Sequence, residues 1–414
     1  MPQQLYAALD IGGTKIAAAL VDAGGTLLTR AELPTPAKGS AEEVMAVVAA
    51  LVETVARDPR WSETVGIGIG SAGPIDPVRG TVSPVNIPGW RDFPLVDHVR
   101  ELDGVHGDVV LIGDGCAMAA GEHWRGAARG YDNALCLVVS TGVGAGLILD
   151  GALRTGPSGN AGHLGHISVD IEGEDCPCGS RGCVEIIASG TSIARWAASN
   201  GWRPTDNVVE SAAAVALPTA RDLAASARIG EVAASPTARD LAASLAANDL
   251  AVSLTSRDLA ASPTANDLAA SAGNAEFAAS PAARDLAASA RAAEVAAPRT
   301  ATAVAPPTAA DVAASARAGD EIALAAFERA GRALAAGIAC AAMLVDIRAA
   351  VIGGGVAKAG PLLLDPLRRH LTTYASLPFT RDLAILPATL GADAGLIGAA
   401  AALAERERGR GGVL

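Results

Sequence analysis

A short segment of the chain concentrates side chains that can bind a metal ion. Cys176, Cys178 and Cys183 lie within eight residues, and His166 precedes the first of them by ten positions, although the whole chain has only six cysteines. In a reducing compartment, clustered thiols more often bind metal or do redox chemistry than form structural disulfides. The segment therefore predicts a metal or redox site. The alternative is a set of thiols that bind no metal.

Three glycine-rich loops could hold phosphate groups. They lie in "YAALDIGGTK" (6–15), "VVSTGVGAGLILDG" (138–151) and "AAVIGGGVAKAG" (349–360). Glycine lets backbone N–H groups approach phosphate oxygens, and the aspartate of the first loop can hold a hydrated cation. Each loop alone could be an ordinary turn, but three loops, each after an apolar run, favour a nucleotide held between two lobes. The candidate residues are Asp10, Gly12, Gly13, Thr14, Lys15, Thr141, Gly142, Gly144, Gly353, Gly354 and Gly355.

The elements that position these loops alternate between strand-like and helix-like segments. Residues 6–28 and 138–151 each read as two strands around a glycine turn, and 349–360 reads as a strand, three glycines and the start of a helix. None of the loops matches the Walker pattern, and no Rossmann fingerprint opens a helix. The sequence thus predicts an α/β protein that binds phosphate in another way.

Composition narrows the classes of partner. The chain has 414 residues, of which 50% are hydrophobic, so it is long enough for two domains. A net charge of −12 argues against a general affinity for nucleic acid or anionic membrane. No apolar run approaches the roughly 20 residues of a membrane span, and the residues before the first loop lack the zones of a signal peptide. We therefore expect a cytoplasmic protein without nucleic-acid or membrane partners.

An alanine-rich repeat interrupts the chain from about residue 205 to 307. Its unit reads approximately "RDLAASPTA", and an acidic residue recurs every nine residues. Leucines spaced in this way fall on opposite faces of a helix, so one long helix would have no continuous apolar stripe. Short helices broken at Ser-Pro pairs, a flexible insert and a solenoid remain alternatives. We expect an inserted passenger segment, although an interaction scaffold is also compatible with the pattern.

The order of the motifs resembles that of the ROK family of sugar kinases and repressors. The motifs are "LDIGGTK", "SAGPID", "SPVNIPGW", "STGVGAG", "GHLGH", "CPCGSRGCVE", "ASG" and "IGGG", and the resemblance covers 5–200 and 308–405. It implies a two-lobed actin-like ATPase (ribonuclease H-like) fold that closes over ATP and a sugar. Repressor members carry a helix-turn-helix before the first phosphate loop. Here that loop begins at residue 9, so the resemblance is to the kinase branch.

The resemblance also implies a domain organisation and a set of partners. The N-terminal lobe would span 1–118 and be completed by a C-terminal helix at 393–409. The C-terminal lobe would span 119–392 and contain the metal loop 166–183 and the repeat insert. The cofactors would be structural Zn²⁺ and the Mg²⁺ that accompanies ATP. We expect a homodimer or homotetramer that binds ATP and a small sugar.

Individual site residues follow from the same resemblance. The family's cysteine cluster assigns four zinc ligands, a Cys₃His set suited to tetrahedral Zn²⁺: His166, Cys176, Cys178 and Cys183. Asp114, between a predicted strand and a predicted helix, matches the family's general base, although a helix-capping aspartate would give the same local pattern. Glu185 would contact the sugar or could instead cap the next helix. The implied sugar-binding residues are Asn86, Asp114, His163, His166 and Glu185.

Two positions depart from the family pattern. Gly113 stands where the family has an asparagine before the base, and His163 stands where it has a glutamate. Both changes affect the expected sugar contacts, whereas the base, the zinc ligands and the phosphate loops are intact. We therefore predict ATP-dependent phosphorylation of a hexose or N-acetylhexosamine at the 6-hydroxyl. The alternative is a non-catalytic sugar-binding or sensor protein of the same fold.

Overall fold

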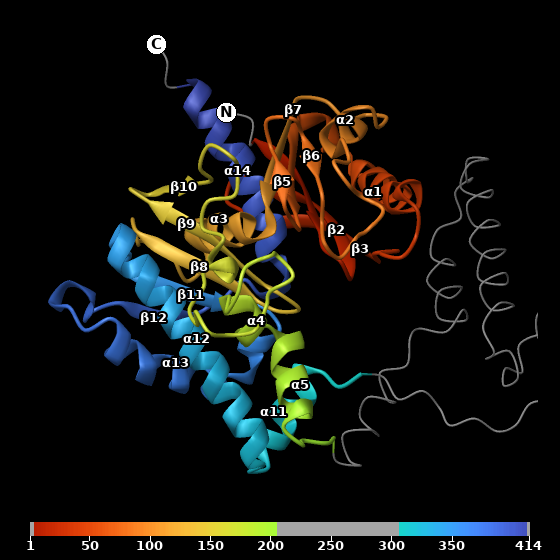
Figure 1. The fold of residues 1–414 in the computed structure, drawn as a ribbon. Helices are drawn as coiled ribbons and strands as arrows, with labels where there is room; N and C mark the ends of the chain where they lie inside the picture. Colours follow the sequence, from red (N-terminus) through yellow and green to blue (C-terminus); the bar gives the residue numbers. More distant parts are fainter. Residues whose placement is uncertain (1–3, 205–305, 412–414) are drawn as a thin grey trace, which may run out of the picture. The chain divides into compact units, whose positions relative to one another are not determined.

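Two five-stranded mixed sheets form the framework of the protein (Figure 1). The computed structural model describes residues 4–204 and 306–411, so the repeat predicted at about 205–307 lies almost entirely outside the described residues. The first sheet has the order β3-β2-β1-β4-β7 and the second has the order β10-β9-β8-β11-β12. The prediction of an α/β protein is confirmed. The division into lobes at 118/119 stays a prediction.

The two sheets repeat one strand arrangement. In each, three successive strands pair antiparallel, and two later strands then add in parallel next to the first of them. The strands of the first sheet are β1 (Leu5–Ile11), β2 (Lys15–Asp22), β3 (Leu27–Pro34), β4 (Thr64–Ser71) and β7 (Asp108–Gly113). Those of the second are β8 (Ala134–Val139), β9 (Val143–Leu149), β10 (Ala152–Arg154), β11 (Ala349–Gly353) and β12 (Ala384–Pro387). A short hairpin comprises β5 (Ile75–Asp76) and β6 (Thr81–Val82).

Helices cover both faces of the first sheet, which explains why its central strands are apolar on both sides. The helix α1 (Ala41–Ala56) begins at a capping box between Ser40 and Glu43 and buries one apolar stripe against the sheet. The helix α14 (Ala394–Gly411) covers the other face with Leu396, Ala399 and Leu403. The C-terminal end of the chain therefore packs against strands formed by its first residues.

Of the remaining helices, α2 packs in the core of the first sheet, and the others lie between the sheets or on the second sheet. The long helix α12 packs Phe327, Leu334 and Ile338 into the core below that sheet and is crossed by α13. Their bounds are α2 (Leu95–Arg100), α3 (Asp114–Arg125), α4 (Val184–Ala188), α5 (Gly190–Ser199), α11 (Ala309–Arg317), α12 (Glu321–Val345) and α13 (Pro361–Tyr374). Short 3-10 turns are η1 (Trp61–Glu63), η2 (Leu164–His166), η4 (Val356–Ala359), η5 (Pro378–Thr380) and η6 (Gly391–Asp393). Within the described ranges, no helix is long and apolar enough to span a membrane.

The predicted strand–turn–strand segments are confirmed, and one predicted helix starts later than its glycines indicated. After β11, the chain makes the single 3-10 turn η4 before α13 begins at Pro361. Gly360 adopts a φ of 63°, which a glycine tolerates and which turns the chain. Proline is favoured at the first helical position because its fixed φ suits the helix and its missing N–H costs nothing there. The three glycines and the turn after them thus form a loop, and the helix begins after that loop rather than directly after the glycines.

Candidate functional site

Two carboxylates lie at the same edge of the first sheet. Asp10 is the next-to-last residue of β1, and Asp114 directly follows β7 as the first residue of α3. Because β1, β4 and β7 run parallel, their carboxyl ends meet at one edge. The Oδ1 atom of Asp114 accepts a 2.7 Å hydrogen bond from the N–H of Gly115, which fixes the carboxylate at the helix start. The predicted strand before Asp114 and helix after it are both confirmed.

The surroundings of these carboxylates favour their protonated forms. Burial is the larger cause and the nearby charge of Asp114 the second, and together they raise the pKa of Asp10 to about 6. Burial also raises the pKa of Asp114, although this side chain reaches solvent and is open to a ligand. The charged forms of the two neighbouring carboxylates are unfavourable without a counter-charge. A cation that neutralises them would therefore be strongly attracted to this site.

Replacing Asp10 with asparagine should stabilise the ligand-free protein. The amide removes an unfavourable charge, and we expect the free energy of unfolding to rise by about 2 kcal/mol at pH 7.5 in magnesium-free buffer. The folded carboxyl binds its proton more tightly than the unfolded one. The penalty is therefore absent below pH 3.8 and complete above a pH of about 6. Urea unfolding at pH 7.5 and pH 5 measures this gain, which should shrink at pH 5.

The control for that experiment is Asp97→Asn, because Asp97 lies on the surface of α2 with 63% of its side chain exposed. That variant should leave the free energy of unfolding within about 0.5 kcal/mol at both pH values. An equal gain at both pH values in Asp10→Asn would mean that something other than the charge at residue 10 destabilises the native protein.

Predicted sugar-binding residues lie directly against predicted phosphate loops. A Cβ atom at Gly13 would collide with the side-chain amide of Asn86, so the first loop and Asn86 are in close contact. In the second loop, a Cβ atom at Gly142 would lie 2.6 Å from Oε2 of Glu185. That same oxygen accepts a 2.8 Å hydrogen bond from the N–H of Val143. Glycines in both loops therefore permit a side chain from another part of the chain to reach the loop backbone.

The second and third loops are neighbours because β8 and β11 pair in parallel. Gly354 has a φ of 91° and lies against the backbone of Val139. The N–H of Gly190, at the start of α5, donates a 2.7 Å hydrogen bond to the carbonyl oxygen of Ser140. Thr191 adds a 3.1 Å bond to the carbonyl oxygen of Thr141. The structure thus brings these two loops together. That they bind phosphate stays a prediction.

Lys15 has a protein partner that sequence reasoning missed. Its ammonium nitrogen lies 2.8 Å from Oε2 of Glu32 on β3 and lowers the pKa of that carboxyl. Arg30 binds the same carboxylate and also Asp393, where Nε lies 2.9 Å from Oδ1. The pairing register of β2 and β3 places these charges side by side. The predicted contact of Lys15 with phosphate would therefore share the ammonium with Glu32.

The four predicted metal ligands converge in space. His166, Cys176, Cys178 and Cys183 offer ligand atoms that all lie within 4.8 Å of one another. Their closest pairs are 3.8 Å, from His166 Nδ1 to the Cys176 sulfur, and 3.7 Å, between the Cys178 and Cys183 sulfurs. Four ligands at about 2.3 Å from a tetrahedral zinc lie about 3.8 Å apart. Both the donor set and its spacing therefore fit Zn²⁺.

The metal loop is joined to the site through His166. Its Nδ1 faces the cysteines, whereas its Nε2 lies 4.0 Å from Oε1 of Glu185. A metal-binding imidazole commonly has a carboxylate near its second nitrogen, which fixes the orientation of the ring. Glu185 thus has one oxygen toward the imidazole and the other on the second phosphate loop. Capping of a following helix, the alternative role for Glu185, is not the contact that its side chain makes.

Two arginines hold the metal loop from outside, and the sequence pattern did not indicate them. Glu174 accepts a 2.7 Å bond from Arg195 on α5 and a 3.0 Å bond from Arg329 on α12. The Arg329 guanidinium also lies 5.8 Å from the centre of the Trp196 ring. Long-range ion pairs of this kind leave no local signal in the sequence. They anchor the loop to helices that belong to the core of the second sheet.

His163 completes the group around Asp114. Its ring stacks on that of His166, with centroids 5.2 Å apart and an angle of 13° between the planes. Burial lowers the pKa of His163, the neighbouring His166 lowers it further, and Asp114 and Glu185 oppose the shift. The imidazole is thus favoured in its neutral form, with one donor and one acceptor nitrogen. The structure brings together Asp114, His163, His166 and Glu185.

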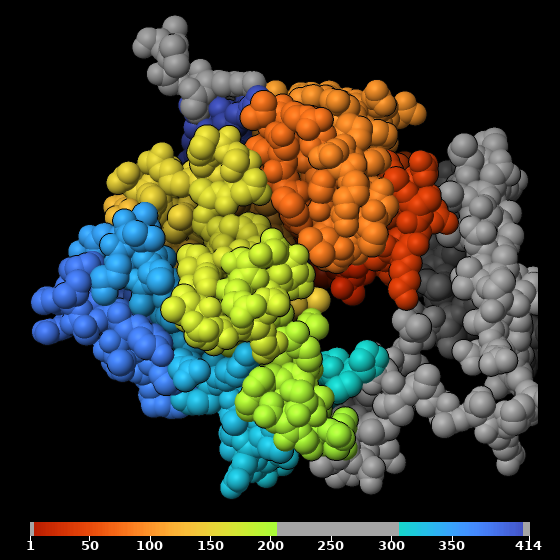
Figure 2. All heavy atoms as spheres, in the orientation of Figure 1, coloured from red at the N-terminus to blue at the C-terminus, as the bar shows by residue number. Residues whose placement is uncertain are grey.

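The segment before His163 contacts the β5–β6 hairpin. The side-chain amide of Asn160 donates a 3.0 Å hydrogen bond to the carbonyl oxygen of Ile75 on β5. Figure 2 shows the yellow segment that contains this loop against the orange segment that contains the hairpin. Asn160 was not among the predicted site residues. It joins two parts of the chain that both lead to predicted sugar-binding side chains.

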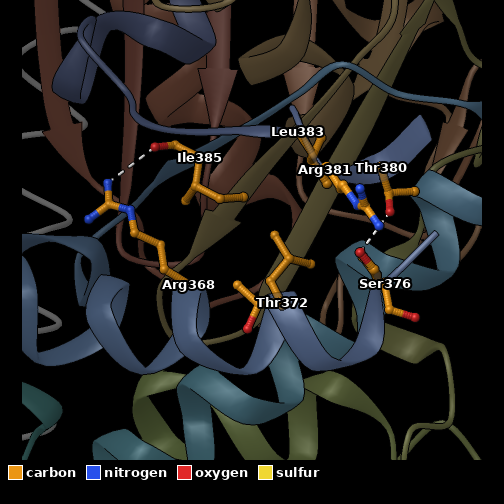
Figure 3. Close-up of a pocket in the computed structure, with 9 residues that line it drawn as sticks. Arg368, Thr372, Ser376, Thr380, Arg381, Leu383 and Ile385 are labelled. Carbon is orange, nitrogen blue, oxygen red and sulfur yellow. Dashed lines mark hydrogen bonds between the residues drawn. The ribbon is translucent and has the colours of Figure 1, made fainter. Parts of the chain in front are cut away.

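A separate pocket of about 470 Å³ lies between α13 and β12 (Figure 3). Arg368 lies at one end, where its guanidinium donates to the carbonyl oxygen of Ile385, and Arg381 lies at the other end. No predicted site residue lines this pocket. It is therefore distinct from the group of carboxylates, imidazoles and glycine loops described above.

Part of the chain is similar to known sugar kinases. Glucokinase of Thermotoga maritima is 37% identical over 198 residues, which are 47% of this chain and 61% of that protein. N-acetylmannosamine kinase of Yersinia pseudotuberculosis is 42% identical over 197 residues, which are 47% of this chain and 64% of that protein. The chain thus matches slightly less than two thirds of the length of these relatives.

A solved structure matches over nearly the whole chain. A ROK family glucokinase from Streptomyces griseus, in complex with glucose and AMPPNP, aligns with a TM-score of 0.63 and 30% identity. The alignment covers 96% of this chain and 98% of that one. The sequence profile of the ROK family matches residues 6–259 and 283–407. With most of its length matched, and with the motifs assembled as described, the chain belongs to the ROK family.

Proposed function

We propose that the protein transfers a phosphoryl group from ATP to the 6-hydroxyl of a hexose or N-acetylhexosamine. The observation that carries this proposal is the placement of Asp114 among polar side chains that can hold a sugar. Asp114 interacts electrostatically with both His163 and Glu185, and its own side chain is open to solvent. The second glycine loop adjoins the same group through Glu185, and Asn86 contacts the first loop. A reacting hydroxyl and a phosphate could therefore be bound next to each other.

Each part of the site has a role in such a reaction. Asp114 would accept the proton of the attacking hydroxyl, and its raised pKa suits a general base better than that of a fully solvated carboxylate. Backbone N–H groups of the glycine loops would orient and stabilise the phosphoryl group. Mg²⁺ bound with ATP would neutralise charge on the phosphates, and Asp10 would help to hold it. The chain's own contribution is position and electrostatics.

The zinc site would act on structure rather than on the reaction. All four ligand positions come from protein side chains, so no open position remains for an activated water. The ion would fix the ring of His166, and through it the environment of Glu185. We place the reaction in the cytoplasm, where the cysteines stay reduced, and we expect a homodimer or homotetramer.

The names of the relatives suggest candidate substrates, which include glucose and N-acetylmannosamine. A coupled assay of ADP release with glucose, fructose, mannose, N-acetylglucosamine and N-acetylmannosamine tests the proposal. Turnover with at least one sugar is expected. The alternative of a non-catalytic sugar-binding protein rests on Gly113 and His163. Saturable sugar binding without turnover on any of the five would favour that alternative.

Replacing His163 with glutamate should shift the sugar preference. A carboxylate accepts hydrogen bonds from two adjacent hydroxyls, whereas the neutral imidazole offers one donor and one acceptor. We expect kcat/KM for glucose to rise by about tenfold relative to the other four sugars. The measurement is the ratio of kcat/KM values across the panel. A matched control is His123→Glu, because His123 lies on α3 at its C-terminal end. An unchanged ratio in His163→Glu would show that residue 163 does not contact the sugar.

A further inference from the structure

Glu122 is a fully buried carboxylate on α3, with none of its surface exposed. Its Oε1 accepts hydrogen bonds from the N–H groups of Thr389, at 3.0 Å, and Leu390, at 2.9 Å. Its Oε2 accepts from the N–H of Ala127 at 2.7 Å and from the Thr389 hydroxyl at 3.3 Å. All four donors are uncharged. None of the roles proposed above for the site uses this residue.

Such an arrangement is costly unless it is complete. A buried carboxylate loses its hydration, and only a full set of hydrogen bonds offsets that loss. Three of the four bonds at Glu122 come from one short segment, Thr389 and Leu390, that lies 267 residues further along the chain. The carboxylate therefore functions as a connection between α3 and this segment.

The segment leads directly into α14 through η6, and the first turn of α14 lies against Asp10. A Cβ atom at Gly395 would come within 2.5 Å of the Asp10 carboxyl carbon, so only glycine permits this approach. On the other side, Asp393 is bound by Arg30. The start of α14 is thus held at two points. One is the exposed ion pair from β3, and the other is the buried carboxylate from α3.

The helix α3 carries functional and connecting groups at its two ends. Asp114 begins the helix, and Glu122 follows eight residues later, about 12 Å along the axis. We propose that Glu122 is a positioning residue: it sets the first turn of α14 against Asp10, and so aligns Asp10 with Asp114 for the reaction. The catalytic part of this proposal rests on the proposed kinase function, whereas the structural part does not.

Glu122→Gln tests the proposal with little change in size. The amide nitrogen must replace one carboxylate oxygen, and either choice makes a donor face the donors that the oxygen satisfied. Hydrogen exchange of the peptide containing Thr389 and Leu390 should become at least tenfold faster. KM for Mg-ATP should rise about fivefold, because the space beside Asp10 is no longer fixed. KM for the sugar should change less than twofold, since Asp114 stays on its own helix.

The control is Glu328→Gln, which makes the same chemical change at a surface carboxylate that binds Arg369 and His370. It should leave the exchange of residues 389–395 and both KM values unchanged. If Glu122→Gln fails to fold, Thr389→Val is the second variant, because it removes only the hydroxyl donor. Hydrogen exchange of the same peptide should then become about twofold faster. Unchanged exchange in that variant overturns the structural part of the proposal.

The possible results separate the two proposals. Faster exchange with unchanged KM for Mg-ATP in Glu122→Gln overturns the positioning role in catalysis. An equal rise in both KM values also overturns it, because a general loss of structure would act on both substrates. Absence of turnover by the unmodified chain on every sugar counts against the proposed function instead. The exchange measurement needs no turnover and still decides whether Glu122 holds the segment.

Discussion

Asp114→Asn should lower turnover by roughly 10²–10⁴-fold and leave the affinity for Mg-ATP within about twofold. Asparagine keeps the size of the side chain, and its amide oxygen can still accept the 2.7 Å hydrogen bond from the N–H of Gly115. The change therefore removes the base without removing the contact that holds it. Burst and steady-state assays with the best sugar of the panel measure the loss.

The pH dependence of the unmodified protein gives a second test of the same residue. The pKa of Asp114 is raised, so the carboxyl should take up its proton at a higher pH than an ordinary aspartate. We expect kcat/KM to fall as the pH decreases through this raised pKa, and to be constant above it. The surface variant Asp97→Asn should keep both the rate and the profile. Near-normal turnover in Asp114→Asn would mean that another group is the base.

Local patterns were sufficient for the elements that carry the site. The alternation of apolar runs and glycines around Asp10 predicted β1 and β2, and the run before Asp114 predicted β7 followed by a helix. Each of these signals needs only neighbours in the sequence. The helix after β11 was predicted to begin right after the three glycines, whereas a 3-10 turn comes first and α13 begins at Pro361, eight residues after the end of the strand.

The contacts that assemble the site could not be predicted in the same way. Asn86 contacts the loop at Gly13, and Glu185 contacts the loop at Gly142, although each residue lies far from its loop in the sequence. Nothing in the spacing of these residues specifies that approach. The resemblance to a family supplied their predicted role in sugar binding, and the structure adds that each contacts a loop backbone. The anchoring role of Glu122 had no sequence signal beyond an acidic residue inside a helix.

The metal centre shows what a dense local motif can specify. Three cysteines and a histidine within 18 residues predicted a ligand set, and the structure places all four ligand atoms within 4.8 Å. What the spacing could not show is the direction of the second imidazole nitrogen of His166, toward Glu185. That orientation links the predicted metal site to a residue predicted to bind the sugar, and it makes the following prediction possible.

Cys178→Ser should remove the metal, which we expect at about one zinc per purified chain. A serine hydroxyl is a poor substitute for a thiolate, and the other three ligands alone would hold the ion weakly. The loop that contains Cys176 and Cys183 should then lose order, as seen by faster hydrogen exchange. Inductively coupled plasma mass spectrometry of the purified protein measures the zinc.

The effect on binding should be selective. Without the metal ion the ring of His166 is no longer fixed, so the Kd for the sugar should rise by about tenfold or more. We expect nucleotide affinity to depend on the glycine loops, none of which supplies a predicted metal ligand, so it should change less than twofold. Cys340→Ser is the matched control, because Cys340 lies on α12 outside the ligand set. Active protein without zinc would refute the metal assignment. Normal sugar affinity in Cys178→Ser would instead mean that the zinc site does not affect sugar binding. The hydrogen bond from the N–H of Val143 would then be sufficient to position Glu185.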